Sequence, residues 1–391
     1  MIKKVVIDKA NRLFQLPPDI FSFRKLSEKA KLLNKSELLD LGRFNWPVDS
    51  KPFESLNNSL KPASASNLNK LKAAIAEWLL NRHQIQVNDH KEIFIGGSIS
   101  SIIYKSALAF IDKGDIVFTP DLGLPIYRKV TTLCGGEPVG YSITGKNNWQ
   151  PDFERITTRL GRVARLLYLN SPHNPTGAIL DSKEIENLMW NAARENLIII
   201  NDAAYQSISE RTAPSILSFK EAKKIGAEIY SMAYNFGLPS MPLGFAVGHR
   251  DIISGLDHAK NICNDFISDG YVEMALEALR QYPSKPLLEA RKQIQLSMAE
   301  ALNLLEKMEL EKAGYETTPF LWAKIERRKS STALANMLYR KYRILTAPGN
   351  SFGENGEGYL RFSLTAKAET YREAIERLKK TKLSAILMEE I

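Results

Sequence analysis

Short β-branched runs alternate with helical segments through the middle of this chain, and this alternation limits the folds open to it. The runs begin at residues 92, 115, 164 and 196 and read EIFIGG, DIVFTP, ARLLYLN and NLIIINDAAY. Helical spacing, as in SKEIENLMWNAARENL, fills the segments between them. Strands joined through helices of about 10–15 residues build a mostly parallel sheet. The runs lack a strict apolar–polar alternation, which indicates that helices cover both faces of that sheet. We therefore expect an α/β fold.

The regions on either side of this block have a different character. After it come long amphipathic segments, then the strand-like runs FLWAKIE, YRILTAPGN and GYLRFSL, and a closing helical segment, ETYREAIERLKKT. We expect residues 49–255 to form a large α/β domain with a mostly parallel sheet flanked by helices. Residues 256–391 are expected to supply linking helices and a small α+β domain. Residues 1–48 are expected to add an arm and a part of that small domain.

The composition narrows the class of protein. The 391 residues are 44% hydrophobic, which is enough for a large buried core. Only two cysteines occur, Cys134 and Cys263, so we expect a cytoplasmic protein without a disulfide framework. Apolar stretches fall short of the roughly 18 residues of a membrane-spanning helix, and we expect no membrane association. The net charge of +9 is spread along helical segments, which favours a solvated surface over a nucleic-acid groove. The five histidines lack the spacing of metal ligands, so we expect no metal site.

Polar loops follow several of the expected strands, at the edge where parallel sheets bind their ligands. GGSISS opens a helix, and free amides at a helix start bind anions, although many ordinary strand-to-helix turns read alike. NSPHNPTG contains turn formers and fits a plain loop equally well. NDAAY offers Asp202 either to a cationic ring or to the cap of the next helix. The residues by themselves leave each of these alternatives open.

The order and spacing of these segments together resemble a known family. ALAFIDKGDIVFTPDLGLPIY, YLNSPHNPTGAIL, NDAAY, LGFAVG and GEGYLRFSL are similar to segments of the class I/II aminotransferases, the pyridoxal 5′-phosphate (PLP) enzymes of fold type I. Within that family, the chain resembles the LL-diaminopimelate and aspartate aminotransferase group. The resemblance covers nearly the whole chain and implies the fold type I architecture. It also implies a homodimer with its sites at the interface, burying well over 2,000 Å² in total. The implied ligands are PLP or pyridoxamine 5′-phosphate and an amino acid or 2-oxo acid.

The resemblance assigns roles to residues that bind the cofactor ring and the substrate. Asp202 matches the aspartate that pairs with the pyridine nitrogen, where an opposite charge favours the protonated ring. Asn174 and Tyr205 match the pair that hydrogen-bonds the 3′-oxygen of the ring. Arg361 matches the arginine whose planar fork binds the substrate carboxylate, the alternative being a strand arginine in a surface ion pair.

The phosphate end of the site is only partly retained. Ser98, Ile99 and Ser100 align with the turn that binds the phosphate, in this register or in one shifted by a residue. Ser231 retains the first serine of the family's Ser-x-Ser-Lys segment and is expected to help bind the cofactor. Lys61 aligns beside the position from which the neighbouring subunit reaches the phosphate. It is expected either to serve there as a point charge or to be an ordinary exposed lysine.

Other positions depart from the family pattern in an organised way. Tyr234 stands where the family has the lysine that bonds the cofactor covalently, and Ala233 replaces a hydroxyl residue. Pro242 stands where the family has its phosphate-binding arginine, and Leu124 replaces the aromatic residue that stacks on the ring. A tyrosine, with a pKa of about 10, cannot form the imine and is a poor base at neutral pH. Positioned general-base catalysis is worth about 10²–10⁴-fold in rate.

Two readings of the function follow. The first is an aminotransferase-family protein with altered chemistry, which binds PLP or pyridoxamine 5′-phosphate non-covalently. The alternative is a catalytically inactive homologue that binds a vitamer or an amino acid, or serves as a partner protein. No other lysine has an evident claim to the catalytic role, since Lys105 and Lys129 are expected to face solvent or the helix layer. Residues 42–46 and 61–67 match the family poorly, so the resemblance assigns no particular amino acid.

Overall fold

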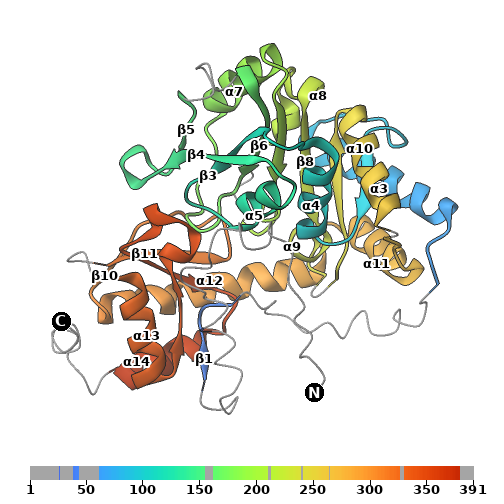
Figure 1. The fold of residues 1–391 in the computed structure, drawn as a ribbon. Helices are drawn as coiled ribbons and strands as arrows, with labels where there is room; N and C mark the ends of the chain where they lie inside the picture. Colours follow the sequence, from blue (N-terminus) through green and yellow to red (C-terminus); the bar gives the residue numbers. More distant parts are fainter. Residues whose placement is uncertain are drawn as a thin grey trace, which may run out of the picture.

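A computed structural model of the chain describes residues 26, 38–43, 61–154, 162–209, 213–238, 241–263, 265–325 and 330–378. Its largest feature is an eight-stranded sheet in the order β2-β9-β8-β7-β6-β3-β4-β5, in which all strands run parallel except β9 and β5 (Figure 1). The strands are β2 (Ile93–Gly96), β3 (Ile116–Pro120), β4 (Glu137–Ile143), β5 (Pro151–Asp152), β6 (Ala164–Asn170), β7 (Ile198–Asp202), β8 (Gly226–Ser231) and β9 (Gly244–Gly248). The expected mostly parallel sheet is confirmed.

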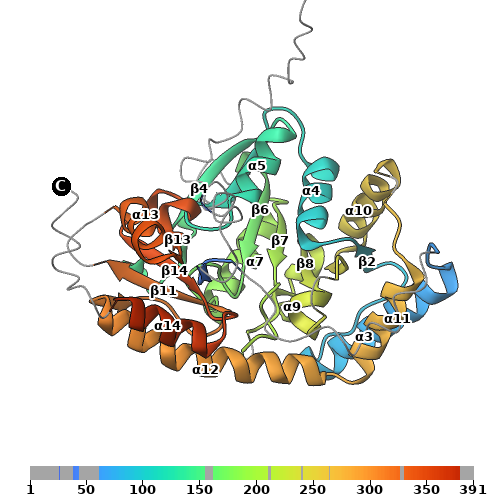
Figure 2. The same cartoon turned by 90° about the horizontal axis from the view of Figure 1, so that it is seen from below.

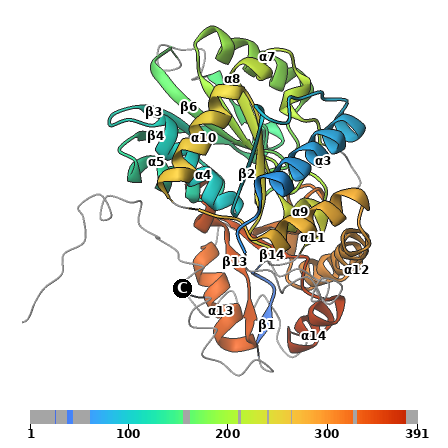
Figure 3. The same ribbon diagram turned by 90° about the vertical axis from the view of Figure 1, so that its right-hand side faces the viewer.

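Helices cover both faces of this sheet. One face packs against α4 (Ile99–Phe110), α5 (Ile126–Leu133) and α10 (Arg250–Ile262). The other packs against α3 (Ala65–His83), α7 (Ser182–Arg194), α8 (Ala222–Ile225) and α11 (Asp269–Arg280). Figure 3 shows α4 and α10 on one side of β2 and α3 on the other. Successive strand residues point to opposite faces: Leu167 joins one buried cluster, while Leu166 and Tyr168 join the other.

A second, smaller sheet carries the end of the chain. It is antiparallel, in the order β10-β11-β14-β13, and a separate parallel pair joins β1 to β12. The strands are β1 (Leu39–Asp40), β10 (Leu310–Lys312), β11 (Phe320–Ile325), β12 (Ile344–Leu345), β13 (Ala347–Pro348) and β14 (Tyr359–Ser363). The helices α13 (Ser331–Tyr342) and α14 (Ala368–Leu378) pack on it. This arrangement confirms the α+β character expected of the C-terminal region.

The long helix α12 (Lys285–Lys307) connects the two sheets. Its apolar residues pack against α14 and β11 near its end, while its start contacts α9 (Met232–Phe236) (Figure 2). Helix α10 runs through the boundary expected at residue 255, and the division into domains remains a proposal. Most of the expected N-terminal arm lies outside the described residues.

Side-chain caps begin several of these helices. The side chains of Ser64, Ser98, Asp181, Ser284 and Ser330 each accept a hydrogen bond from a backbone amide in the first turn that follows.

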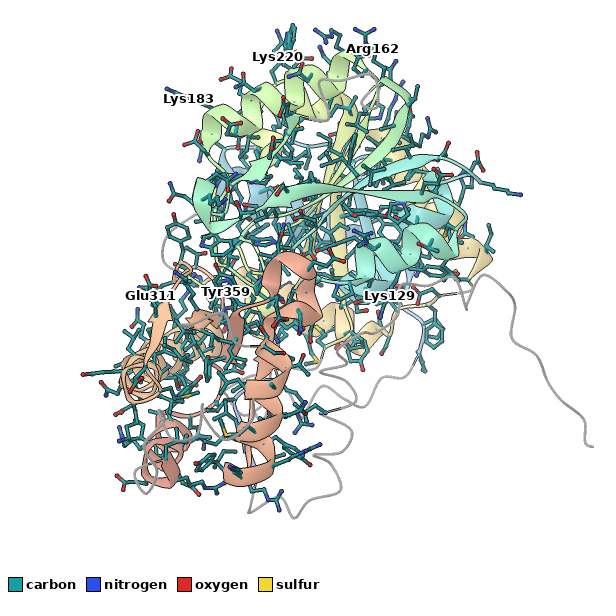
Figure 4. All side chains as sticks on the ribbon, turned by 60° about the vertical axis from the view of Figure 1, so that its left-hand side comes forward. Lys129, Arg162, Lys183, Lys220, Glu311 and Tyr359 are labelled. Atoms are coloured by element: carbon teal, nitrogen blue, oxygen red, sulfur yellow. The ribbon has the colours of Figure 1, made fainter. Side chains whose placement is uncertain are left out.

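Within the described ranges, no helix is both long enough and apolar enough to cross a membrane. Figure 4 shows Arg162, Lys183 and Lys220 around one end of the large sheet and Lys129 well away from them.

Candidate functional site

The carboxyl ends of neighbouring parallel strands bring the candidate residues together. β2 ends at Gly96 and β8 ends at Ser231, and both residues pair with Gly244 on the strand between them. Asp202 ends β7 and pairs with Asn170, the last residue of β6. Gly244 permits this convergence, because a β-carbon there would lie 2.8 Å from the carbonyl oxygen of Tyr230. The loop segments singled out by the sequence therefore meet at one edge of the sheet, as parallel topology predicts.

Asp202 is a buried carboxylate held by two donors. Its Oδ2 accepts a hydrogen bond from the Tyr127 hydroxyl at 2.8 Å, and its Oδ1 accepts one from the Ala204 amide at 3.1 Å. Burial raises the pKa of Asp202 to about 6, although these two hydrogen bonds oppose the rise. A nearby cation strongly stabilises the charged form of a buried carboxylate such as this one.

Asn174 links Tyr205 to Arg361. Its Nδ2 donates to the Tyr205 hydroxyl at 3.2 Å, and its Oδ1 accepts from Arg361 Nη1 at 3.0 Å. The other terminal nitrogen of Arg361 donates to the carbonyl of Gly42 at 3.1 Å, and Gly42 lies two residues after β1. The Asn174 side chain therefore connects Tyr205, assigned to the cofactor ring, with Arg361, assigned to the substrate carboxylate.

Arg361 is buried and its guanidinium is only partly satisfied. The residue is 6% exposed, and its Nε has no hydrogen-bond partner among the described residues. The guanidinium carbon lies 3.9 Å from the ring centre of Phe320 and 4.6 Å from that of Phe352. Burial lowers the pKa of Arg361 to about 10, which leaves it charged at neutral pH. A buried cation with an unused donor points to an anionic ligand.

Tyr234 lies against this group. Ser231 caps the start of the short helix α9, and its hydroxyl accepts a hydrogen bond from the Tyr234 amide at 3.3 Å. The Tyr234 and Tyr205 rings are stacked, with centroids 5.5 Å apart and an interplanar angle of 22°. Burial raises the pKa of the Tyr234 hydroxyl, and the charge of Asp202 raises it further. The hydroxyl is therefore neutral at pH 7, and the side chain offers no amine.

The turn assigned to the phosphate forms the start of α4. The Ser98 hydroxyl accepts the Ser101 amide at 3.4 Å, Ile99 is partly buried, and Ser100 is exposed. Pro242, which the resemblance assigns to the place of the family's arginine, is also exposed. Leu124 is partly buried between the two apolar clusters of the large sheet, just before α5. As a proline, residue 242 itself offers no cation.

The three lysines considered from the sequence have different surroundings. Lys129 on α5 is partly exposed (Figure 4). Lys105 does not face solvent: it is 3% exposed, and its Nζ donates to Ser101 Oγ at 2.5 Å and to Asp265 Oδ2 at 2.8 Å. Lys61 is exposed and its carbonyl accepts the Asp269 amide at 2.9 Å. That Lys61 supplies a positive charge to the phosphate bound in a neighbouring subunit stays a prediction.

Three residues at the site were not predicted from the sequence. Tyr127 lies on the first turn of α5 and ends the segment ALAFIDKGDIVFTPDLGLPIY, whose resemblance to the family was a signal that could have found it. Gly42 and Asp265 carry no local signal, because each reaches the site through packing of distant segments. In the part of the chain that the structure describes, no group of three or more His, Cys, Asp or Glu residues is placed to hold a metal ion.

Comparison with known proteins identifies relatives of this chain. The aminotransferase class I and II family profile matches residues 53–378. The LL-diaminopimelate aminotransferase of Halothermothrix orenii is 30% identical over 95% of this chain and 98% of its own length. That of Moorella thermoacetica is 31% identical over 96% and 98%. Among solved structures, substrate-bound BacF from Bacillus subtilis has a TM-score of 0.83 at 24% identity, over 96% of this chain and 98% of its own. The aspartate aminotransferase of Thermotoga maritima has a TM-score of 0.83 at 20% identity, over 95% and 99%.

Proposed function

The chain belongs to the class I and II aminotransferases, and on that premise we propose that it binds a pyridoxal or pyridoxamine vitamer without a covalent link. The same site would bind the carboxylate of an amino acid or 2-oxo acid. The observation that carries the proposal is Arg361, a buried cation whose Nε has no partner among the described residues and which Asn174 ties to Tyr205.

The ring end of the site fits the family's cofactor, PLP. Asp202 presents a buried carboxylate for the ring nitrogen, and the Asn174–Tyr205 pair presents polar groups for the 3′-oxygen. A bound cofactor of this kind supplies an electron sink for bonds at the substrate α-carbon. The protein's own residues would hold the ring protonated and orient the carboxylate at Arg361.

The covalent end of the site does not fit. Tyr234 has no amine, and its ring is stacked on the ring of Tyr205. Because burial raises the pKa of the Tyr234 hydroxyl, that group is also a poor proton acceptor at neutral pH. These two features favour a binding role over ordinary transamination. A transaminase with altered chemistry is the second candidate, supported by the joint presence of Asp202, Asn174 and Arg361. Arg361 donates to Asn174, and Asn170 bonds both the Asn174 amide and the Asp202 carbonyl.

Titration calorimetry with the dialysed protein tests the binding role. Pyridoxamine and its 5′-phosphate serve as ring probes, and LL-diaminopimelate and aspartate serve as carboxylate probes because relatives are named for them. Arg361→Gln should weaken the carboxylate probes by about tenfold or more, since hydrogen bonds to charged groups contribute about 1.5–3 kcal/mol. Arg194→Gln removes an exposed arginine on α7 and should change nothing. Absence of binding by every probe would refute the proposal.

We also propose a cytoplasmic homodimer, as the family resemblance implies. Two large apolar side chains near the end of α10, Ile262 and Phe266, are 85% and 64% exposed, which favours a covered surface at this place. Light scattering at micromolar concentration should report twice the mass of the chain. A monomer under those conditions would contradict the dimer.

A further inference from the structure

A carboxylate of the protein itself lies at the turn assigned to the phosphate. A β-carbon added to Gly97 would be 3.7 Å from Asp265 Oδ2 and 3.6 Å from Ser101 Oγ. Asp265 follows α10, and its Oδ2 accepts a hydrogen bond from Lys105 Nζ at 2.8 Å. The start of α4 therefore has an anionic neighbour before any ligand arrives.

Lys105 reaches this turn from inside the molecule. Side chains on a helix lean toward its N-terminus, and the Lys105 amine accordingly lies at Ser101, one turn nearer the start of α4. The Lys105 side chain is 3% exposed, whereas that of Asp265 is 27% exposed. The carboxylate is thus the outer member of the pair, and it neutralises the only lysine of α4.

The amines of Lys105 and Lys260 lie near this turn, and each already binds another group of the protein. Pro242 holds the place of the family's arginine. Lys260 on α10 donates its amine to the carbonyl of Ile95 at 2.9 Å, and it shares its surroundings with Asp257, Asp265 and Lys72. A phosphate group approaching the turn therefore meets a like charge at Asp265, which disfavours binding.

We propose that Asp265 excludes phosphorylated vitamers and that the site takes the unphosphorylated ring, pyridoxal or pyridoxamine, whose 5′-hydroxymethyl group is neutral. This inference rests on the proposed function and names its ligand class. A hydroxymethyl group can donate a hydrogen bond to a carboxylate, whereas a phosphate dianion cannot. The competing account makes Lys105 a phosphate ligand, with Asp265 as a counterion that yields to the phosphate.

Calorimetry with pyridoxamine, pyridoxamine 5′-phosphate and inorganic phosphate separates these accounts. The wild-type protein should bind pyridoxamine at least as tightly as its phosphate ester. Asp265→Asn should shift this preference toward the ester by about tenfold or more, because a nearby like charge is removed. Lys105→Met should weaken the ester further. Asp251→Asn removes an equal charge from the exposed start of α10, where the side chain is 77% exposed, and should leave the preference unchanged.

The outcomes distinguish failure of this inference from failure of the proposed function. A wild-type preference for the ester by tenfold or more, lost in Lys105→Met, would overturn the role of Asp265 and leave ring binding intact. If neither ring compound binds any variant, the proposed function fails, and inorganic phosphate decides the remaining question. Phosphate binding to Asp265→Asn but not to the wild type would support an excluding carboxylate. Equal phosphate binding by the two proteins would overturn it.

Discussion

The ring of Tyr234 lies on the ring of Tyr205, with centroids 5.5 Å apart and planes 22° apart. Tyr205 in turn accepts a hydrogen bond from Asn174, which binds Arg361. Tyr234, which the resemblance assigns to the family's lysine position, is therefore packed against the residues that would hold the ring and the carboxylate. A stacked aromatic pair contributes about 0.5–1.5 kcal/mol beyond its buried area, so this contact also supports the local structure.

Tyr234→Lys should restore covalent cofactor binding. The backbone at this position is held by the Ser231 cap and by Gly237 at the end of α9, so a lysine would start from the same place. With pyridoxal or its 5′-phosphate, the variant should develop the visible absorbance of an imine. Borohydride should then attach one pyridoxyl group to the new lysine.

Tyr234→Phe is the matched control for this substitution. It keeps an aromatic ring on Tyr205 and supplies no amine, so it should bind the vitamers without the visible band. If the lysine variant stays colourless while the phenylalanine variant still binds pyridoxamine, the position would not face the ring, and the site geometry argued from Tyr234 would be wrong.

Asp202→Asn should change how stability depends on pH in the ligand-free protein. Burial raises the pKa of Asp202 from 3.8 to about 6 in the folded state, so folding favours the protonated carboxyl. The contribution of this group to the free energy of unfolding therefore falls as pH rises from about 4 to above 6, by about 3 kcal/mol in all. Relative to the wild type, the variant should gain stability over this range.

Urea unfolding of both proteins at pH 5 and pH 7.5 checks the sign. His83 and His173, whose pKa values burial lowers to about 4, are present in both proteins and cancel in the comparison. A difference between the two proteins that stays constant with pH, or that grows in the opposite direction, would refute the raised pKa of Asp202. The same variant should bind pyridoxamine more weakly at neutral pH.

Gly237→Ala should destabilise the fold and loosen the helix that carries Tyr234. Gly237 ends α9 with a φ of 74°, and a β-carbon there would lie 2.6 Å from the amide nitrogen of Leu287 on α12. The left-handed backbone alone costs about 1–2 kcal/mol for a residue with a β-carbon, and the backbone contact adds to it. Gly114→Ala is the control, because Gly114 has a φ of 88° and open space around it. Equal losses in urea unfolding would show that contact with α12 does not matter.

The fold and half of the site follow from local patterns, and the rest depends on distant packing. The position of Asp202 and of the turn before α4 follows from strand ends, because parallel strands gather their carboxyl ends at one edge. Arg361 was predicted as a site residue only from the family resemblance. The structure adds its hydrogen bond to Gly42, which depends on the pairing of β1 with β12. The Lys105–Asp265 pair spans 160 positions. Its formation depends on how the end of α10 packs against α4, and no periodicity in the sequence encodes that contact.

The most direct test of the account asks whether any lysine of this chain bonds the cofactor. The wild-type protein is incubated with PLP or pyridoxal, reduced with borohydride, digested and examined by mass spectrometry, with the Tyr234→Lys variant as the positive control. The account predicts that no single lysine of the wild type carries a stoichiometric pyridoxyl group, and that bound vitamer is removed by dialysis before reduction. A stoichiometric pyridoxyl-lysine peptide from the wild type, at Lys105 or elsewhere, would contradict it.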